Sequence, residues 1–195
     1  ITWVTGVQTC ALPISSEHKM VQKFILDSVI YWATEYHIDG FRFDLMGLHD
    51  VDTINLIISK LKEINKNAMV YGEGWNLETT LSKENKTIQE NSTKTPQIGF
   101  FNDTIRDSLK GSIFSSKDKG FVNGKEKLEN LIKFCTMGCA LDYKNFKAIY
   151  KSPSQSINYV SCHDNHTLWD KIQLTNPDNS IEDKKSMVKL ALGIL

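Results

Sequence analysis

Three segments of this chain place acidic side chains where strands are expected to end. They are DGFRFDLMGLHD at residues 39–50, YGEGW at residues 71–75 and VSCHDNHTLWDK at residues 160–171. Cleavage of a glycosidic bond uses one carboxylic acid to protonate the leaving oxygen and one carboxylate on the other face of the sugar. Asp44, Glu73 and Asp164 can supply both groups and a third. The three segments together therefore predict a glycosidase active site.

The spacing of Asp44 and Glu73 predicts the type of mechanism. If their strands are parallel neighbours, the backbones lie about 4.8 Å apart, and the two carboxyl groups can lie roughly 5 Å apart, as in retaining enzymes. Asp44 would be the nucleophile, kept ionised and oriented by Arg42 on the same strand face. Glu73 would be the acid/base, and the negative charge of Asp44 and Asp164 is expected to raise its proton affinity. A structural ion pair is the simpler interpretation of Arg42 and Asp44 taken alone.

The third segment and one tryptophan offer candidate contacts to substrate. His163 and Asp164 cannot both face inward while the chain stays extended, so we expect the loop to reorient one of them. Both are interpreted as groups that hold sugar hydroxyls and stabilise an oxocarbenium-like transition state, with Asn165 beside them. Taken singly, the HDN triplet is more simply an Asx-type turn. Trp75 is either a flat platform for a sugar ring or a packing residue.

Helices and strands alternate along the part of the chain that carries these residues. Apolar side chains recur at helical spacing over 17–36, with Ser16 as the expected N-cap. Phe41 to Asp44 alternate apolar and charged, as in a strand. The remaining expected elements are a helix over 51–64, a strand at 68–73, a polar excursion over 77–97, a strand at 98–103, a helix over 125–140, a strand at 157–162, and a last helix after the capping box of Ser180 and Asp183.

This order predicts an α/β fold with parallel strands, specifically a partial (β/α)8 TIM barrel. Such barrels carry catalytic groups at the carboxyl ends of several strands and usually need about 250 residues. The chain has 195 residues and four expected strands, which is about half of such a barrel. Residues 1–14 match nothing that follows and are interpreted as foreign to the fold, leaving 15–195 as the partial catalytic domain. Open strand edges predict poor stability or self-association.

Composition and charge narrow the classes of partner. The chain is 41% hydrophobic and 24% charged, with a net charge of +0 and a pI near 7.1. No basic surface for nucleic acid or anionic lipid is expected, and no apolar run approaches the roughly 20 residues of a membrane span. The four cysteines lack a CxxC pair and are expected to be buried free thiols, which weakly favours a reducing compartment. A neutral glucan suits this balance, and no specific protein partner is predicted.

The three segments resemble the sequence regions of the alpha-amylase superfamily (glycoside hydrolase family 13), whose members have a (β/α)8 barrel. They look most like the type I pullulanase subfamily, which debranches alpha-1,6-glucosidic links in pullulan, starch and glycogen. The resemblance covers residues 16–195, and it implies that the chain corresponds to roughly the fourth to seventh strands of the barrel and their helices. It implies Asp44 as nucleophile, Glu73 as acid/base and Asp164 as transition-state stabiliser, with Arg42 and His163 as supporting contacts. The chemistry then needs no cofactor or metal, and calcium binding is left open.

The chain also departs from the family pattern. It lacks a DVVYNH-like segment upstream, a YNWGYDP-like segment, and everything after the start of the helix that follows the seventh strand. A complete parent is therefore expected to be a hydrolase, whereas this chain alone is expected to be inactive.

Three alternatives remain open. One is an alpha-amylase-type hydrolase acting on alpha-1,4 links. Another is a metal-dependent hydrolase, because His163, Asp164 and His166 cluster in the sequence. The third is a degenerate barrel that binds glucan without cleaving it.

Overall fold

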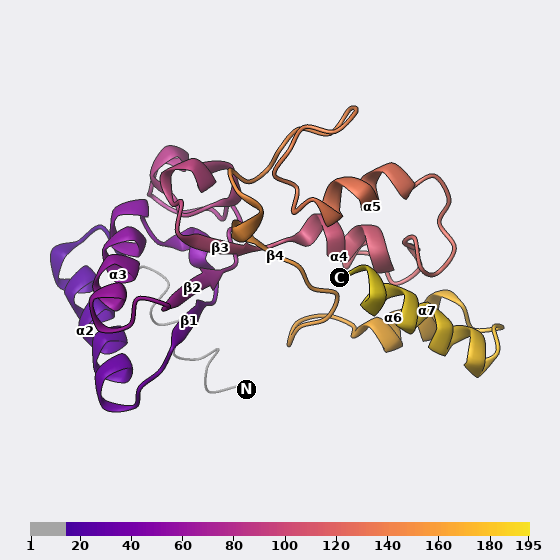
Figure 1. Cartoon of the computed structure of the whole chain (residues 1–195), viewed down its shortest axis with the longest axis horizontal. Coiled ribbons are helices and arrows are strands. Elements are labelled where there is room, and N and C mark those ends of the chain that lie inside the picture. Colours follow the sequence, from indigo (N-terminus) through magenta and orange to yellow (C-terminus); the bar gives the residue numbers. More distant parts are fainter. Residues whose placement is uncertain (1–14) are drawn as a thin grey trace. The chain divides into compact units, whose positions relative to one another are not determined.

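A computed structural model describes residues 15–195, so the interpretation of residues 1–14 as foreign to the fold concerns a segment outside the described part. The chain divides into two compact units, which meet in sequence between Gly99 and Phe100. Among the described helices, none is long and apolar enough to cross a bilayer. Figure 1 shows the elements of both units in sequence colours.

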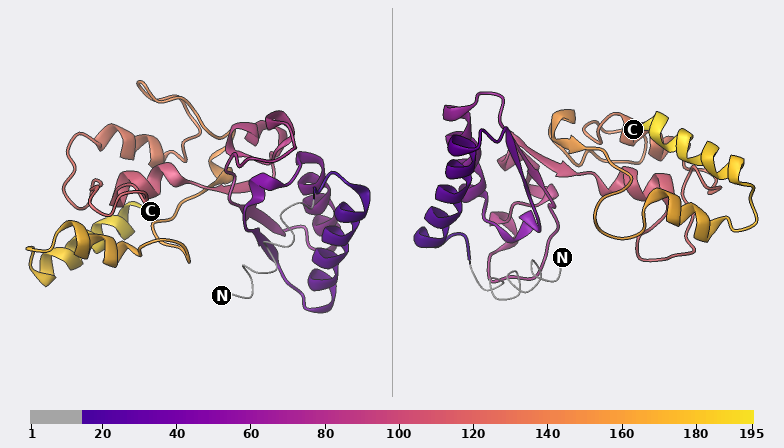
Figure 2. Two further views of the ribbon diagram at one scale, coloured as in Figure 1. Left: turned by 180° about the vertical axis from the view of Figure 1, so that it is seen from behind. Right: turned by 90° about the horizontal axis from the view of Figure 1, so that it is seen from below.

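Two parallel strands and two helices form the framework of the first unit. β1 (Gly40–Phe43) pairs in parallel with β2 (Met69–Gly72), and Arg42 lies opposite Tyr71 in the register. α2 (Lys19–Glu35) and α3 (Val51–Ile64) pack against each other, and Figures 1 and 2 show them on the same side of the strand pair. This is the strand, helix, strand unit that the sequence predicts, and it brings the carboxyl ends of β1 and β2 to one edge.

α3 has the bounds that the sequence pattern predicts. Asp50 caps it by accepting a hydrogen bond of 2.8 Å from the Thr53 amide, which satisfies one of the free N–H groups of the first turn. One face of the helix is buried and apolar: Ile54, Ile57, Ile58 and Leu61. Burial of such side chains stabilises the unit by about 1.5–3 kcal/mol each.

α2 differs from its prediction in two ways. Ser16 is not its N-cap, because the helix begins after His18. The Ser16 hydroxyl instead donates to the Asp50 carboxylate at 2.5 Å, so it ties the start of the chain to α3. The expected apolar stripe is also only partly covered, because Val29 and Ala33 are its only buried members in the described structure. The large exposed side chains of this helix and its end are Met20, Phe24, Tyr31, Trp32 and Tyr36.

The polar excursion after β2 is confirmed, and it contains two short 3-10 helices, η2 (Lys83–Asn85) and η3 (Gln89–Lys94). β3 (Ile98–Phe101) follows it. The last two residues of β3 begin the second unit, where they pair in parallel with β4 (Ser156–Ile157). The expected strand at 98–103 is therefore present and ends two residues early, because Asn102 caps a helix by accepting from the Ile105 amide.

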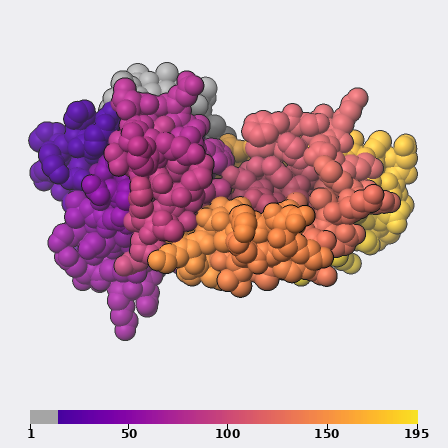
Figure 3. Space-filling view, turned by 90° about the horizontal axis from the view of Figure 1, so that it is seen from above, coloured from indigo at the N-terminus to yellow at the C-terminus, as the bar shows by residue number. Residues whose placement is uncertain are grey.

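Helices make up most of the second unit. They are α4 (Asp103–Lys110), α5 (Glu129–Thr136), the 3-10 turn η4 (Pro153–Gln155), α6 (Leu168–Thr175) and α7 (Ile181–Ile194). Ser180 caps α7, since its hydroxyl accepts from the Asp183 amide at 3.1 Å, and the same hydroxyl donates to the Asp183 carboxylate at 2.8 Å, so the pair approximates a capping box. The connection between α5 and β4, orange in Figures 1 and 3, has little regular structure besides η4, although Cys139, Tyr150 and Gln155 within it are buried.

Two predicted elements of the second unit are too long. The helix expected over 125–140 shrinks to α5, because Lys127 and Cys139 both adopt left-handed backbone angles, with φ of 63° and 50°. The strand expected at 157–162 ends at Ile157. Cys135 and Cys139 are buried free thiols, as expected. The prediction of a buried thiol is wrong for Cys162, which is half-buried, and Cys10 lies outside the described residues.

Candidate active site

Arg42 joins the two carboxylates that end the first two strands. Its guanidinium forms one ion pair with Asp44 and another with Glu73. The Glu73 side chain is only 4% exposed, whereas that of Asp44 is 38% exposed. Strand alternation predicts that Arg42 and Asp44 lie on one face, and the Arg42–Asp44 pair agrees with this. The Arg42–Glu73 pair is an additional contact between the two strands, which alternation within one strand does not predict.

The carboxylates of Asp44 and Glu73 have the spacing that the parallel strands predict. An oxygen of one lies within 4.8 Å of an oxygen of the other. Asp44 directly follows β1 and Glu73 directly follows β2. This separation leaves no room for a water molecule between a sugar and the attacking carboxylate, and it is typical of retaining glycosidases.

Arg42 is positively charged in this site, because its pKa is raised above the ordinary value. Burial lowers the pKa of Arg42, but the hydrogen bond to Asp44 and the charges of Glu73 and Asp44 together raise it above its ordinary value. A permanently charged guanidinium between two carboxylates reduces their mutual repulsion. The raised proton affinity that we expect for Glu73 stays a prediction.

The structure adds Leu45 to the site, a residue that no sequence pattern marks as functional. Leu45 has φ 46° and ψ 42°, the left-handed region, which a bulky L-residue rarely adopts. In this conformation its amide donates a hydrogen bond of 2.7 Å to the Glu73 carboxylate. Backbone strain of this kind costs about 1–3 kcal/mol and is held in place by surrounding structure. Here it turns the chain sharply after Asp44 and fixes the second oxygen of Glu73.

Backbone hydrogen bonds lock the two strand ends together. The Glu73 amide donates to the Phe43 carbonyl at 3.2 Å, and the Gly47 amide donates to the Glu73 carbonyl at 2.9 Å. Trp75, two residues further on, is half-buried. Its carbonyl approaches Gly47 so closely that a Cβ there would lie 1.9 Å from the oxygen. The backbone of Trp75 is therefore fixed, and its use as a sugar platform stays a prediction.

His163, Asp164 and Asn165 lie in the second unit, on the loop between β4 and α6. The His163 and Asp164 side chains are 61% and 46% exposed, and His163 Nε2 lies 3.5 Å from Asp164 Oδ1. Asn165 has φ 63°, a turn conformation that asparagine tolerates. The turn interpretation therefore suits Asn165, while contacts of these three residues to sugar stay predictions.

Several residues that the sequence patterns do not mark form hydrogen bonds that stabilise this loop. Lys110, at the end of α4, is 2% exposed and donates to the His166 carbonyl at 2.8 Å. Burial and the nearby charge of Arg106 lower the pKa of Lys110. Thr167 caps α6, and the Ser161 hydroxyl accepts from the Leu168 amide at 2.8 Å. No sequence pattern predicts that a lysine such as Lys110 is buried.

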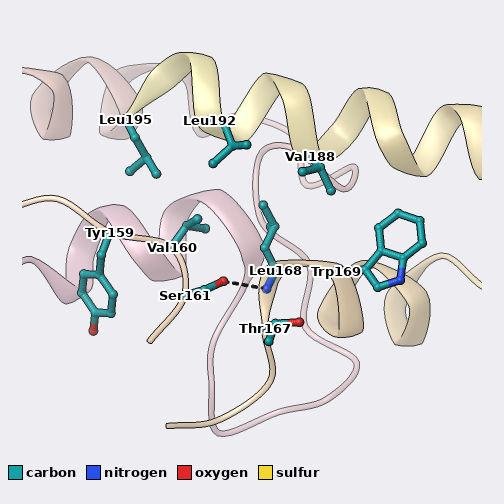
Figure 4. A pocket seen from close by; sticks show the side chains of 9 residues that line it. All are labelled: Tyr159, Val160, Ser161, Thr167, Leu168, Trp169, Val188, Leu192 and Leu195. Atoms are coloured by element: carbon teal, nitrogen blue, oxygen red, sulfur yellow. Dashed lines mark hydrogen bonds between the residues drawn. The ribbon is translucent and has the colours of Figure 1, made fainter. Parts of the chain in front are cut away.

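The second unit also contains an apolar hollow of about 470 Å³ between the loop and helices α6 and α7. Figure 4 shows Val188 and Leu192 of α7, with Leu195 directly after this helix, on one side and Val160 and Leu168 on the other. No acidic side chain lines it. The hollow therefore lacks the groups that hydrolysis needs, and it is not the candidate active site.

Comparison with known proteins relates this chain to pullulanases. No family model matches the chain. The chain is 42% identical over 182 residues to a pullulanase of Bacillus subtilis, a match that covers 93% of this chain and 25% of that protein. It is 32% identical over 203 residues to a pullulanase of Klebsiella pneumoniae, covering 84% of this chain and 18% of that one.

Solved structures agree with the sequence matches. The pullulanase of Paenibacillus barengoltzii in complex with maltohexaose and alpha-cyclodextrin superposes with a TM-score of 0.89 at 46% identity, covering 92% of this chain and 28% of that one. The chain thus spans about a quarter of the length of these relatives. These matches confirm the resemblance to the alpha-amylase superfamily and its pullulanases, and they confirm the fold class as a partial barrel.

Proposed function

We propose that this chain, a homologue of pullulanases over about a quarter of their length, carries the nucleophile and the acid/base of a retaining debranching glycosidase. The observation that supports this most is the arrangement of Arg42, Asp44 and Glu73. One permanently charged guanidinium contacts both carboxylates, and the carboxylates lie within 4.8 Å of each other at adjacent strand ends. A double-displacement mechanism needs two carboxyl groups at this spacing.

The proposed reaction has two steps. Asp44 attacks the anomeric carbon while Glu73 gives its proton to the departing glycosidic oxygen, so one C–O bond forms as the other breaks. Glu73 then takes a proton from water, whose oxygen displaces Asp44 and releases the sugar with its original configuration. Arg42 orients both groups throughout, and the Leu45 amide keeps one Glu73 oxygen in place.

The proposed substrate is an alpha-glucan with alpha-1,6 links, such as pullulan, starch or glycogen. Relatives of this chain have been crystallised with maltohexaose and alpha-cyclodextrin and with maltotetraose. Those ligands belong to those proteins, and they support a glucan here because identity to them is 45–46%. The proposed chemistry requires neither a metal nor a cofactor.

We also propose that this chain does not hydrolyse glucan alone. It spans about a quarter of its relatives, and the predicted sugar contacts His163 and Asp164 are largely exposed to water in it. Glycosidases obtain much of their rate from groups that enclose and distort the sugar. The experiment must therefore supply the remainder of an enzyme.

A chimera tests the proposal. Residues 15–195 replace the matching segment of the B. subtilis relative, and maltotriose release from pullulan is measured. We expect turnover in the chimera and none in the isolated chain. Glu73→Gln should lower kcat by about 10²–10⁴-fold, and Asp44→Asn should lower it further because the nucleophile is lost. Unchanged turnover in either variant would refute the assignment of that residue.

Azide rescue separates the two roles. In the chimera carrying Glu73→Ala, azide should restore turnover and give a glycosyl azide of retained configuration, because it replaces the second nucleophile. In Asp44→Ala it should give the inverted product, because it replaces the first. Cleavage of amylose without pullulan would support the alpha-1,4 alternative. Glucan binding without turnover by a folded chimera would support the non-catalytic one.

A further inference from the structure

Three different metal-binding groups converge on the loop that follows β4. Ligand atoms of Cys162, His163 and Asp164 all lie within 4.8 Å of one another, although the three residues are consecutive in the chain. Consecutive residues of an extended strand point to opposite faces. The chain has left the strand at Ile157, and Asn165 reverses it with φ 63°. Outside a regular strand the alternation does not apply, and the loop brings the thiol, the imidazole and the carboxylate together.

The distances are close to those of a tetrahedral metal site. With Zn–N near 2.0–2.1 Å and Zn–O near 2.0–2.2 Å, two ligand atoms of a tetrahedron lie about 3.4 Å apart. His163 Nε2 and Asp164 Oδ1 are 3.5 Å apart. The Cys162 sulfur lies 3.5 Å from the Asp164 carbonyl oxygen, within the same loop. The half-buried Cys162 thiol lies within 4.8 Å of the other two ligand atoms, so a rotation of its side chain would bring it to bonding distance.

The chemistry of the donors selects the class of cation. A thiolate and an imidazole favour zinc-like divalent ions over calcium and magnesium, which prefer oxygen ligands. A thiolate, a neutral imidazole and a carboxylate carry a charge of about −2, which balances a divalent ion. The loop is also open to water, so solvent can complete the coordination.

We propose that Cys162, His163 and Asp164 form a binding site for a zinc-class divalent cation, with water as the remaining ligand. The site does not include Asp44 and Glu73, the pair that performs bond cleavage in the proposed chemistry. It occupies the atoms of His163 and Asp164 that the resemblance assigns to sugar contacts. One consequence rests on the proposed function: the bound cation competes with glucan for these atoms and inhibits the enzyme.

Titration of the full chain with Co²⁺ alone tests binding without any activity assay. A cobalt–thiolate bond produces a charge-transfer absorption in the near ultraviolet, and Zn²⁺ should displace it. We expect one equivalent of Co²⁺ to give the band. Changes in residues that only support a metal ligand cost about 10–100-fold in affinity, so Cys162→Ser should abolish the band and His163→Gln should weaken binding by at least about tenfold.

Controls separate this site from the other thiols. Cys10→Ser removes another cysteine and leaves the proposed ligands intact, so the band should persist in it. Circular dichroism of each variant establishes that it is folded, and Asp164→Asn provides a further variant on the exposed loop. A band that survives Cys162→Ser, or that disappears in Cys10→Ser, would overturn the proposal. Because no sugar is present, these outcomes are independent of whether the proposed hydrolase function holds.

Discussion

The two ion pairs of Arg42 should differ in strength because their partners differ in burial. Arg42 is 23% exposed, Glu73 4% and Asp44 38%. A hydrogen bond to a charged group in a largely buried setting contributes about 1.5–3 kcal/mol. An ion pair with substantial exposure contributes about 0.2–1 kcal/mol, because water screens it. We therefore expect the Arg42–Glu73 coupling energy to exceed the Arg42–Asp44 coupling energy by about 1–2 kcal/mol.

Double-mutant cycles measure this difference. One combines Arg42→Met with Glu73→Gln, and the other combines Arg42→Met with Asp44→Asn, so each cycle is the control for the other. The free energy of unfolding is taken from urea titrations followed by amide NMR signals of residues 15–99, which report on the first unit alone. Equal coupling energies, or a larger one for Asp44, would refute the reasoning that burial of Glu73 makes its contact the stronger one.

Three further predictions concern the same unit. Because β-branched residues are disfavoured in the left-handed region, Leu45→Val should be less stable to urea than Leu45→Ala by about 1 kcal/mol; the opposite order would mean that packing outweighs strain. Burial lowers the pKa of His49 below 6.5 despite the charge of Asp50, so the unfolded chain binds the proton more readily. The melting temperature should therefore fall as the pH drops through about 6.5, and a slope that persists unchanged in His49→Gln would contradict this. Trp32 is 47% exposed beside other aromatic side chains, so self-association measured by sedimentation velocity should decrease in Trp32→Glu, and monomers in the unmodified chain would contradict the prediction.

Local patterns were sufficient to locate the strands and the carboxylates of the first unit. β1 and β2 are short strands, each with a glycine at one end, and each is followed directly by an acidic residue. α3 has both a cap and a clear apolar face. Parallel pairing then follows from the strand, helix, strand order. The spacing of Asp44 and Glu73 needed only that pairing and the known distance between strands.

The remaining errors arise where backbone conformation overrides side-chain pattern. Residues 125–140 have helical periodicity, but left-handed angles at Lys127 and Cys139 confine the helix to α5. Ser16 matches an N-cap signal and instead bonds to Asp50, which is distant in sequence. Leu45 has no sequence signal at all, because leucine is not a residue that predicts a left-handed turn. Such features depend on contacts that form only after the chain has folded.

Close backbone contact explains why the carboxylate spacing is so well defined. A Cβ on Gly72 would lie 2.3 Å from the Phe43 carbonyl oxygen, and one on Gly47 would lie 1.9 Å from that of Trp75. Any side chain at these two positions would force the ends of β1 and β2 apart. Both glycines lie within three residues of a proposed catalytic carboxylate. Separation of a nucleophile from an acid/base determines whether a sugar is attacked directly or through water. The glycines of DGFRFDLMG and YGEGW therefore fix the quantity on which a retaining mechanism depends, even though they offer no chemical group of their own.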